Sequence, residues 1–153
     1  MKILDYLKES WIIPELKGRD KTSILRELSE VLVEPCGVSS SEELLSVLLE
    51  REKLGSTGIG EGVAIPHGRL RRLKQFFISF GRSTQGVDFD SMDHRPCQLF
   101  FLVMAPENSA SENLHLLARI ANLLKDTSFK KRLMEASSQR ELYEIISEED
   151  QKY

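Results

Sequence analysis

The sequence has few of the residues that would suggest an oxidising compartment or a membrane. Its 153 residues include only two cysteines, Cys36 and Cys97, which lie far apart and in no metal-ligand spacing. We therefore expect no disulfide and predict that both cysteines are small buried hydrophobic side chains. No apolar run approaches the length of a membrane span, and the N-terminal residues lack the apolar core of a signal peptide. These absences predict a cytoplasmic protein without direct membrane insertion.

The sequence also lacks the positive excess of a nucleic-acid-binding protein, since its net charge is −3. A local basic run lies between Arg69 and Lys74. No aromatic platform or recognition-helix pattern accompanies this run, so we interpret it as a solvated surface strand or loop. We therefore predict no nucleic-acid partner.

Motifs for nucleotides, metals and other cofactors are missing as well. The glycine-rich stretch 55–62 is not followed by the Lys-Ser/Thr pair of a Walker motif, so nucleotide binding is not expected. The loop 86–95 carries three aspartates and a histidine, but it lacks the full ligand pattern of an EF-hand. A zinc site built from His67, His94 and His115 would have no short-range ligand pair. The prediction is no metal and no cofactor.

The length and periodicity predict one α/β domain over residues 1–153. Apolar residues suited to strands lie at 11–13, 63–65, 75–82 and 99–105, and the last run is continuous, as in a strand covered on both faces. Helical spacing follows Asp20, Ser40, Ser109 and Ser138, with a further helix around Phe129. In the helix after Ser109, we expect one buried stripe: Leu114, Leu117, Ala118, Ala121 and Leu124. Strands surrounded by helices indicate a sheet layered between helices.

The stretch Gly55–Gly68 is the feature around which the rest of the chain is organised. Its glycines let the backbone approach a ligand closely and free N–H groups to point at an anion. Pro66 is expected to end the short strand 63–65, which places His67 at a junction between strand and loop. On chemistry alone two interpretations stand: a ligand site, or a glycine-rich turn beside a core histidine.

The segment REKLGSTGIGEGVAIPHG, residues 51–68, resembles the active-site segment of the fructose/mannitol-type enzyme IIA domains. These domains belong to the bacterial phosphoenolpyruvate-dependent sugar phosphotransferase system. The likeness continues through 114–116 and 141–146, and so covers most of the chain. It implies a mixed parallel and antiparallel sheet flanked by helices on both faces. It also implies a phosphotransferase component that accepts a phosphoryl group from a histidine-containing phosphocarrier protein.

The resemblance assigns roles to individual residues. It implies that His67 accepts the phosphoryl group on Nε2, with Arg51 as a charge clamp and His115 as a hydrogen-bond donor to that group. Gly68, Thr57 and Ser56 are candidate substrate-binding residues. Gly68 would let a ligand approach the backbone closely, and Thr57 and Ser56 would offer hydroxyl donors. Without the resemblance, Arg51 would be read as satisfying a helix dipole, His115 as structural, and the two hydroxyls as capping or turn residues.

Two functions are compatible with the resemblance. One is a sugar-uptake component that passes phosphate to a separate IIB domain. The other is a nitrogen-type regulatory enzyme IIA, whose phosphorylation state controls its binding to target proteins. The sequence before Asp20 and the absence of a fused IIB or IIC segment favour the regulatory function. A sensor domain that has lost phosphotransfer is disfavoured because Arg51, His67 and His115 are all present.

Overall fold

A six-stranded mixed sheet forms the centre of the computed structural model, which describes all residues 1–153. Its strand order is β1-β5-β6-β3-β2, and β4 also pairs with β6. Pairing is parallel for β1 with β5 and for both β3 and β4 with β6, and it is antiparallel for β5 with β6 and for β2 with β3. The predicted mixed sheet is confirmed. The strands are β1 Ile12–Ile13, β2 Gly58–Gly60, β3 Val63–Ala64, β4 His67–Leu70, β5 Phe77–Val87 and β6 Cys97–Pro106.

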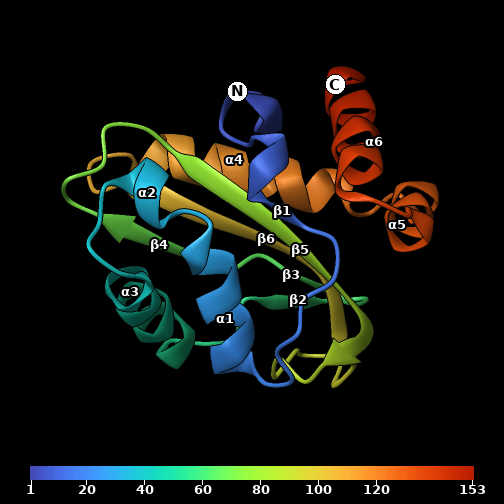
Figure 1. Ribbon diagram of the computed structural model, residues 1–153, viewed down its shortest axis with the longest axis horizontal. Helices are drawn as coiled ribbons and strands as arrows, with labels where there is room; N and C mark the ends of the chain where they lie inside the picture. The colour runs from blue at the N-terminus through green and yellow to red at the C-terminus, as the bar shows by residue number, and fades with distance from the viewer.

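Helices cover both faces of this sheet, as the sequence predicts (Figure 1). The helices α1 to α3 pack on one face, and α4 to α6 cover the other, with α4 behind the sheet and α6 beside β1 (Figure 1). None of the helices combines the length and the apolar character needed to cross a lipid bilayer. Their bounds are α1 Lys21–Glu30, α2 Val33–Cys36, α3 Ser41–Lys53, α4 Ala110–Leu123, α5 Thr127–Glu135 and α6 Gln139–Gln151, after the 3-10 turns Ile3–Asp5 and Glu9–Trp11.

Strand β6 separates two hydrophobic cores because successive side chains of a strand point to opposite faces. Leu99, Phe101 and Val103 join the core under α4 to α6. Phe100 and Met104 join the core under α1 to α3. Cys97, which is buried and unpaired, also joins this core despite having the parity of Leu99, at the point where the register between β5 and β6 shifts. The continuous apolar run of the sequence is therefore a central strand buried on both faces.

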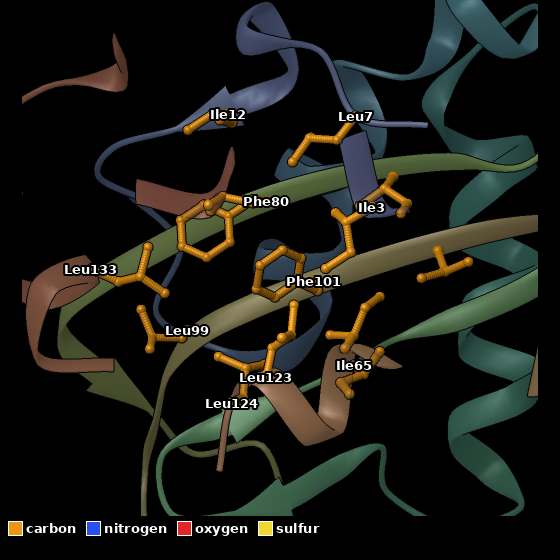
Figure 2. Packing of buried hydrophobic residues seen from close by; sticks show 14 of the residues in the cluster. Ile3, Leu7, Ile12, Ile65, Phe80, Leu99, Phe101, Leu123, Leu124 and Leu133 are labelled. Carbon is orange, nitrogen blue, oxygen red and sulfur yellow. The ribbon is translucent and has the colours of Figure 1, made fainter. Parts of the chain in front are cut away.

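The core on the α4 side is built around two aromatic rings at the centre of the sheet. Phe80 of β5 and Phe101 of β6 meet edge to face, with ring centroids 4.8 Å apart. Leu123 and Leu124 from the end of α4 pack close to Phe101, and Ile65 lies beside them (Figure 2). Helix α4 is thus anchored to the sheet close to the segment that precedes His67.

The predicted buried stripe of α4 is wrong at two of its five positions, since Leu124 is buried and Leu117 and Ala121 are partly buried against the core. Leu114 is 68% exposed, and Ala118 is exposed as well. Both stripes have helical spacing, so periodicity alone could not choose between them, and the observed stripe includes a polar residue that a hydrophobic pattern omits. The observed buried residues are Asn113, Leu116, Ile120, Leu123 and Leu124.

Strands β3 and β4 run along the same partner strand and are separated by two residues. Val63 pairs with Leu99 of β6, and His67 pairs with Val103 further along β6. Pro66 lies in the gap, where it cannot donate a ladder hydrogen bond, although its carbonyl accepts one from Val103 N–H at 2.9 Å. The basic run after His67, expected in a surface strand or loop, begins within β4.

Candidate active site

The imidazole of His67 faces the layer that contains α4. His67 lies opposite Val103, whose side chain belongs to the core under α4. The next residue, Gly68, lies opposite Met104, which belongs to the core under α3. Paired residues on neighbouring strands project to the same face, so the His67 ring points to the α4 side and Gly68 borders α3.

Both ring nitrogens of His67 have a hydrogen-bond partner. Nδ1 lies 2.8 Å from the carbonyl oxygen of Ile65, and Nε2 lies 3.3 Å from Nε of Arg51. A carbonyl oxygen can only accept and a guanidinium N–H can only donate, so the proton is assigned to Nδ1 and the lone pair to Nε2. No backbone N–H donates to the Ile65 carbonyl, so this oxygen is free for the contact. The site therefore holds an imidazole whose nucleophilic nitrogen is Nε2.

The protein favours the neutral form of this imidazole. Partial burial lowers the pKa of His67 below its ordinary value of 6.5, because the charged ring loses hydration. The hydrogen bond to Ile65 and the charge of Glu52 oppose this shift, while the positive charges of Arg51 and Arg69 add to it. At neutral pH the ring is therefore uncharged, and Nε2 is available as a nucleophile.

Arg51 reaches His67 from the last turn of α3. Its Nη1 donates to the carbonyl oxygen of Gly55 at 2.8 Å, while Nε points to the imidazole. The guanidinium is thus held between the glycine-rich loop and the histidine, and its remaining N–H groups have no protein acceptor. These groups can bind an anion that arrives at Nε2.

Gly68 allows α3 to pack closely on β4. A Cβ atom at this position would lie 2.6 Å from Cγ1 of Val47, a distance that requires the helix or its side chain to move. Because Arg51 lies one turn further along the same helix, the missing side chain at Gly68 brings the guanidinium within reach of His67. Gly68 therefore shapes the site through packing.

The hydroxyl groups of Ser56 and Thr57 are engaged inside the loop. Ser56 donates its hydroxyl to the carbonyl oxygen of Phe89 and accepts a hydrogen bond from Gly58 N–H at 3.0 Å. Thr57 is buried and donates its hydroxyl to the carboxylate of Glu52. Each hydroxyl has one proton to donate, so both protons are already used within the protein. The loop then turns through Gly60, Glu61 and Gly62, all with positive φ.

His115 lies in the second turn of α4 and is exposed. No hydrogen bond joins its ring to another protein group, in contrast to His67. It belongs to the helix that covers the face toward which the His67 ring points. The third histidine, His94, lies in the loop between β5 and β6 and has a positive φ of 60°.

Sequence reasoning did not single out two charged residues behind the loop. Glu52 follows Arg51 in α3, and its side chain is only 5% exposed. Its partner Lys21 comes from the first turn of α1 at 3.0 Å. The only sequence signal for Glu52 is its place beside Arg51, and Lys21 gives none, because the contact joins residues that are 31 positions apart.

Comparisons with known proteins find similar sequences over almost the whole chain. A family model described as "Phosphoenolpyruvate-dependent sugar phosphotransferase system, EIIA 2" matches residues 5–149. A nitrogen regulatory protein of Bradyrhizobium diazoefficiens is 40% identical over 147 residues, which are 96% of this chain and 95% of that protein.

Solved structures show the same fold. The crystal structure of nitrogen regulatory protein IIA-Ntr from Neisseria meningitidis matches with a TM-score of 0.87 at 35% identity, and the match covers 93% of this chain and 97% of that one. A chain in the Escherichia coli complex of enzyme IIAMTL and phosphorylated enzyme IIBMTL matches with a TM-score of 0.76 at 27% identity. That match covers 93% of this chain and 99% of the other.

Proposed function

We propose that this chain, which belongs to the EIIA 2 family of the phosphoenolpyruvate-dependent sugar phosphotransferase system, carries a phosphoryl group on Nε2 of His67. The observation that carries the proposal is the pair of hydrogen bonds on the imidazole, from Nδ1 to Ile65 and from Arg51 to Nε2. Together they leave one nitrogen with a lone pair and place a cation beside it. The proposed domain comprises residues 1–153.

The transfer is a displacement at phosphorus. The donor is a phosphohistidine on a histidine-containing phosphocarrier protein. The lone pair of His67 Nε2 attacks the phosphorus, a new N–P bond forms, and the N–P bond of the donor breaks and leaves its imidazole with the electron pair. The proton on Nδ1 stays in place. The His67 ring then carries positive charge, which the Ile65 carbonyl stabilises and which makes the ring a good leaving group for onward transfer.

Three residues complete the proposed site. Arg51 exchanges its contact with Nε2 for phosphoryl oxygens, which a guanidinium can meet in pairs. His115, whose ring nitrogens have no protein partner, donates a hydrogen bond to the phosphoryl group. Gly68 keeps α3 close to β4. Ser56 and Thr57 contribute by fixing the loop, since their hydroxyl protons are used internally.

Labelling tests the proposal. Incubation with phosphoenolpyruvate, enzyme I and the phosphocarrier protein should add one phosphoryl group in an acid-labile, alkali-stable linkage. The His67→Ala variant should remain unlabelled, with unchanged circular dichroism as evidence that it folds. Full labelling of this variant would place the phosphoryl group elsewhere and reject the proposal.

We further propose that this carrier is cytoplasmic and regulatory, because proteins similar to it in sequence and structure include nitrogen regulatory proteins. Phosphorylation replaces a neutral imidazole by a group with about −1.5 to −2 charges. A partner that covers the site must then desolvate or pair this charge, and couplings of this kind change affinity by roughly 5–150-fold. Affinity capture with fully phosphorylated and fully unphosphorylated protein should therefore recover different target proteins.

The alternative is transport, in which the phosphoryl group passes to a separate IIB domain. The match to enzyme IIAMTL in its complex with phosphorylated enzyme IIBMTL favours testing this directly. Phosphorylated protein should be mixed with purified fructose- and mannitol-type IIB domains. Rapid transfer, combined with identical captured proteins for the two phosphorylation states, would support transport and reject the regulatory function.

A further inference from the structure

A continuous series of hydrogen bonds leads from α1 to the imidazole of His67. Lys21 Nζ donates to the Glu52 carboxylate at 3.0 Å, and this carboxylate accepts from both the N–H and the hydroxyl of Thr57. The Thr57 carbonyl accepts from Ile65 N–H at 3.0 Å, and the Ile65 carbonyl contacts His67 Nδ1 at 2.8 Å. Each member therefore orients the next one.

Burial leaves the carboxylate of Glu52 few hydrogen-bond partners other than Lys21 and Thr57. Its side chain is 5% exposed, and a buried carboxylate must be paired and hydrogen-bonded. Lys21 is 19% exposed and supplies the charge, while Thr57 supplies two donors. Loss of either partner would leave polar groups buried without a partner, which is costly enough to shift the loop.

Lys21 of α1 contacts two other segments behind the glycine-rich loop. Its ammonium bridges Glu52 in α3 and Asp90, at 3.3 Å, in the loop after β5. It also lies 4.8 Å from the ring centroid of Phe89, whose carbonyl accepts the hydroxyl of Ser56. The glycine-rich loop that contains Ser56 also presents the Gly55 carbonyl that holds Arg51. The position of Lys21 therefore affects the placement of both His67 and Arg51.

We propose that Lys21 and Glu52 are positioning residues for phosphotransfer, which act through Thr57 and Ile65 to fix the tautomer and orientation of His67. This inference rests on the proposed function of His67. Neither residue touches the imidazole. Their contribution is to keep the loop in the arrangement in which Nδ1 faces the Ile65 carbonyl and Nε2 faces Arg51.

The test uses small changes in the full-length protein. Thr57→Val removes the hydroxyl with little change in shape, Glu52→Gln removes the charge, and Lys21→Met removes the cation. Each should lower the rate constant for phosphorylation, by roughly 10²-fold where the reacting atoms shift by about 1 Å. KM for the phosphocarrier should stay near its wild-type value, because the docking surface is unchanged. Thr57→Ser and Lys21→Arg should restore most of the rate.

The matched control is a second ion pair between the same two helices. Arg26 of α1 and Glu42 of α3 are 3.1 Å apart, and both side chains are well exposed. Arg26→Met breaks a connection between α1 and α3 without touching the loop, so it should leave the rate and the His67 spectrum unchanged. Thermal unfolding of every variant shows that the compared proteins are folded.

A charge swap separates positioning from simple ion pairing. In the double variant Lys21→Glu/Glu52→Lys the ion pair can form again, but an ammonium group cannot accept the hydrogen bond from Thr57 N–H. The swap should recover stability relative to Glu52→Lys alone while the rate remains low. Recovery of the full wild-type rate in the swapped protein would overturn the positioning role.

A spectroscopic readout keeps this inference distinct from the proposed function. The ¹⁵N shifts of His67 in unphosphorylated protein report its tautomer, and Glu52→Gln and Thr57→Val should move them toward a tautomer mixture. Unlabelled wild-type protein would refute the proposed function but not this spectroscopic result. Wild-type rates and unchanged His67 shifts in Thr57→Val, Glu52→Gln and Lys21→Met would refute the inference itself.

Discussion

Both ring nitrogens of His67 are hydrogen-bonded within the protein, whereas the ring of His115 has no protein partner. His67 is held by the backbone of its own segment and by Arg51 from α3. His115 is exposed on α4. In the proposed function, Nε2 of His67 is thus oriented before a phosphoryl group arrives, while the ring of His115 keeps its hydrogen-bonding capacity for that group.

The nucleophilic nitrogen proposed for His67 is already occupied by a hydrogen bond, whereas the ring of His115 has none. Arg51 donates to the same Nε2 lone pair that attacks phosphorus in the proposed transfer, so the proposal requires this contact to open. The guanidinium stays anchored at Gly55, and a small rotation can redirect its N–H groups to phosphoryl oxygens. In this proposal His67 keeps its orientation during transfer, while the guanidinium of Arg51 changes its hydrogen-bond acceptor.

The largest expected effect comes from replacing the two histidines one at a time. His67→Gln should abolish phosphorylation completely, since no other imidazole has a cation at its free nitrogen. His115→Asn should still be labelled at His67, although more slowly. Phosphoryl incorporation measured by intact-protein mass spectrometry distinguishes the two variants. Equal loss of labelling in both would remove the distinction between acceptor and donor.

Arg51→Ala and His115→Asn should have comparable effects on rate but different effects on the resting protein. Removing one preorganised donor to the transferring group costs about 2.7–4 kcal/mol, or roughly 10²–10³ in rate. Only Arg51→Ala should alter the ¹⁵N shifts of unphosphorylated His67, because only Arg51 contacts Nε2 before transfer. An altered His67 spectrum in His115→Asn would show that the second histidine is not free.

Gly68→Ala tests the close packing of α3 on β4 beside His67. The added methyl group would meet Val47, and such overpacking typically costs about 1–3 kcal/mol of stability. It should also slow phosphorylation by displacing α3 and Arg51. Val47→Ala in the same protein should restore part of both losses, as measured by urea unfolding and initial labelling rates. A double variant as impaired as Gly68→Ala would argue that Gly68 acts through some other contact.

The smallest expected effect is the pH dependence of phosphoryl acceptance and of stability that comes from His67. Because the pKa of His67 is lowered from 6.5, more than half of the rings are neutral at pH 6.5, and acceptance there should exceed half of its plateau rate. The unfolded chain binds the proton more tightly than the folded one, so this histidine makes the protein less stable as pH falls through 6.5.

Variants around the ring report on the causes of that shift. Arg51→Ala should raise the NMR titration midpoint of His67, and Glu52→Gln should lower it, since their charges act in opposite directions. Urea unfolding of wild type and His67→Gln at several pH values measures the stability contribution. A wild-type midpoint above 6.5 would contradict the assignment of a desolvated, neutral ring.

Local signals in the sequence were sufficient for most elements of the fold. Asp20 caps α1 by accepting from Ser23 N–H at 2.8 Å, and Ser138 caps α6 by accepting from Glu141 N–H at 3.0 Å, where polar caps precede helical patterns. The continuous apolar run became β6. These features depend on neighbours a few residues apart, which a sequence displays directly.

Features that depend on distant contacts were missed. The sequence identified Pro66 as the end of a strand, but it could not show that the chain resumes as β4 along the same neighbour, β6. Periodicity placed Leu114 inside, whereas packing against the sheet selected a different stripe. The contact of Lys21 with Glu52 depends on how two helices meet. The resemblance supplied His67, Arg51 and His115 and implied Nε2 as the acceptor, but only the structure identifies Ile65 as the residue whose carbonyl orients Nδ1.

The central claim is that Nε2 of His67 is the oriented acceptor, and NMR of ¹⁵N-labelled protein tests it most directly. Before phosphorylation, the shifts should show the proton on Nδ1 and the lone pair on Nε2. After phosphorylation, one-bond coupling between ³¹P and ¹⁵N should appear at Nε2 of His67 alone. Coupling at Nδ1, or at either nitrogen of His94 or His115, would contradict the account.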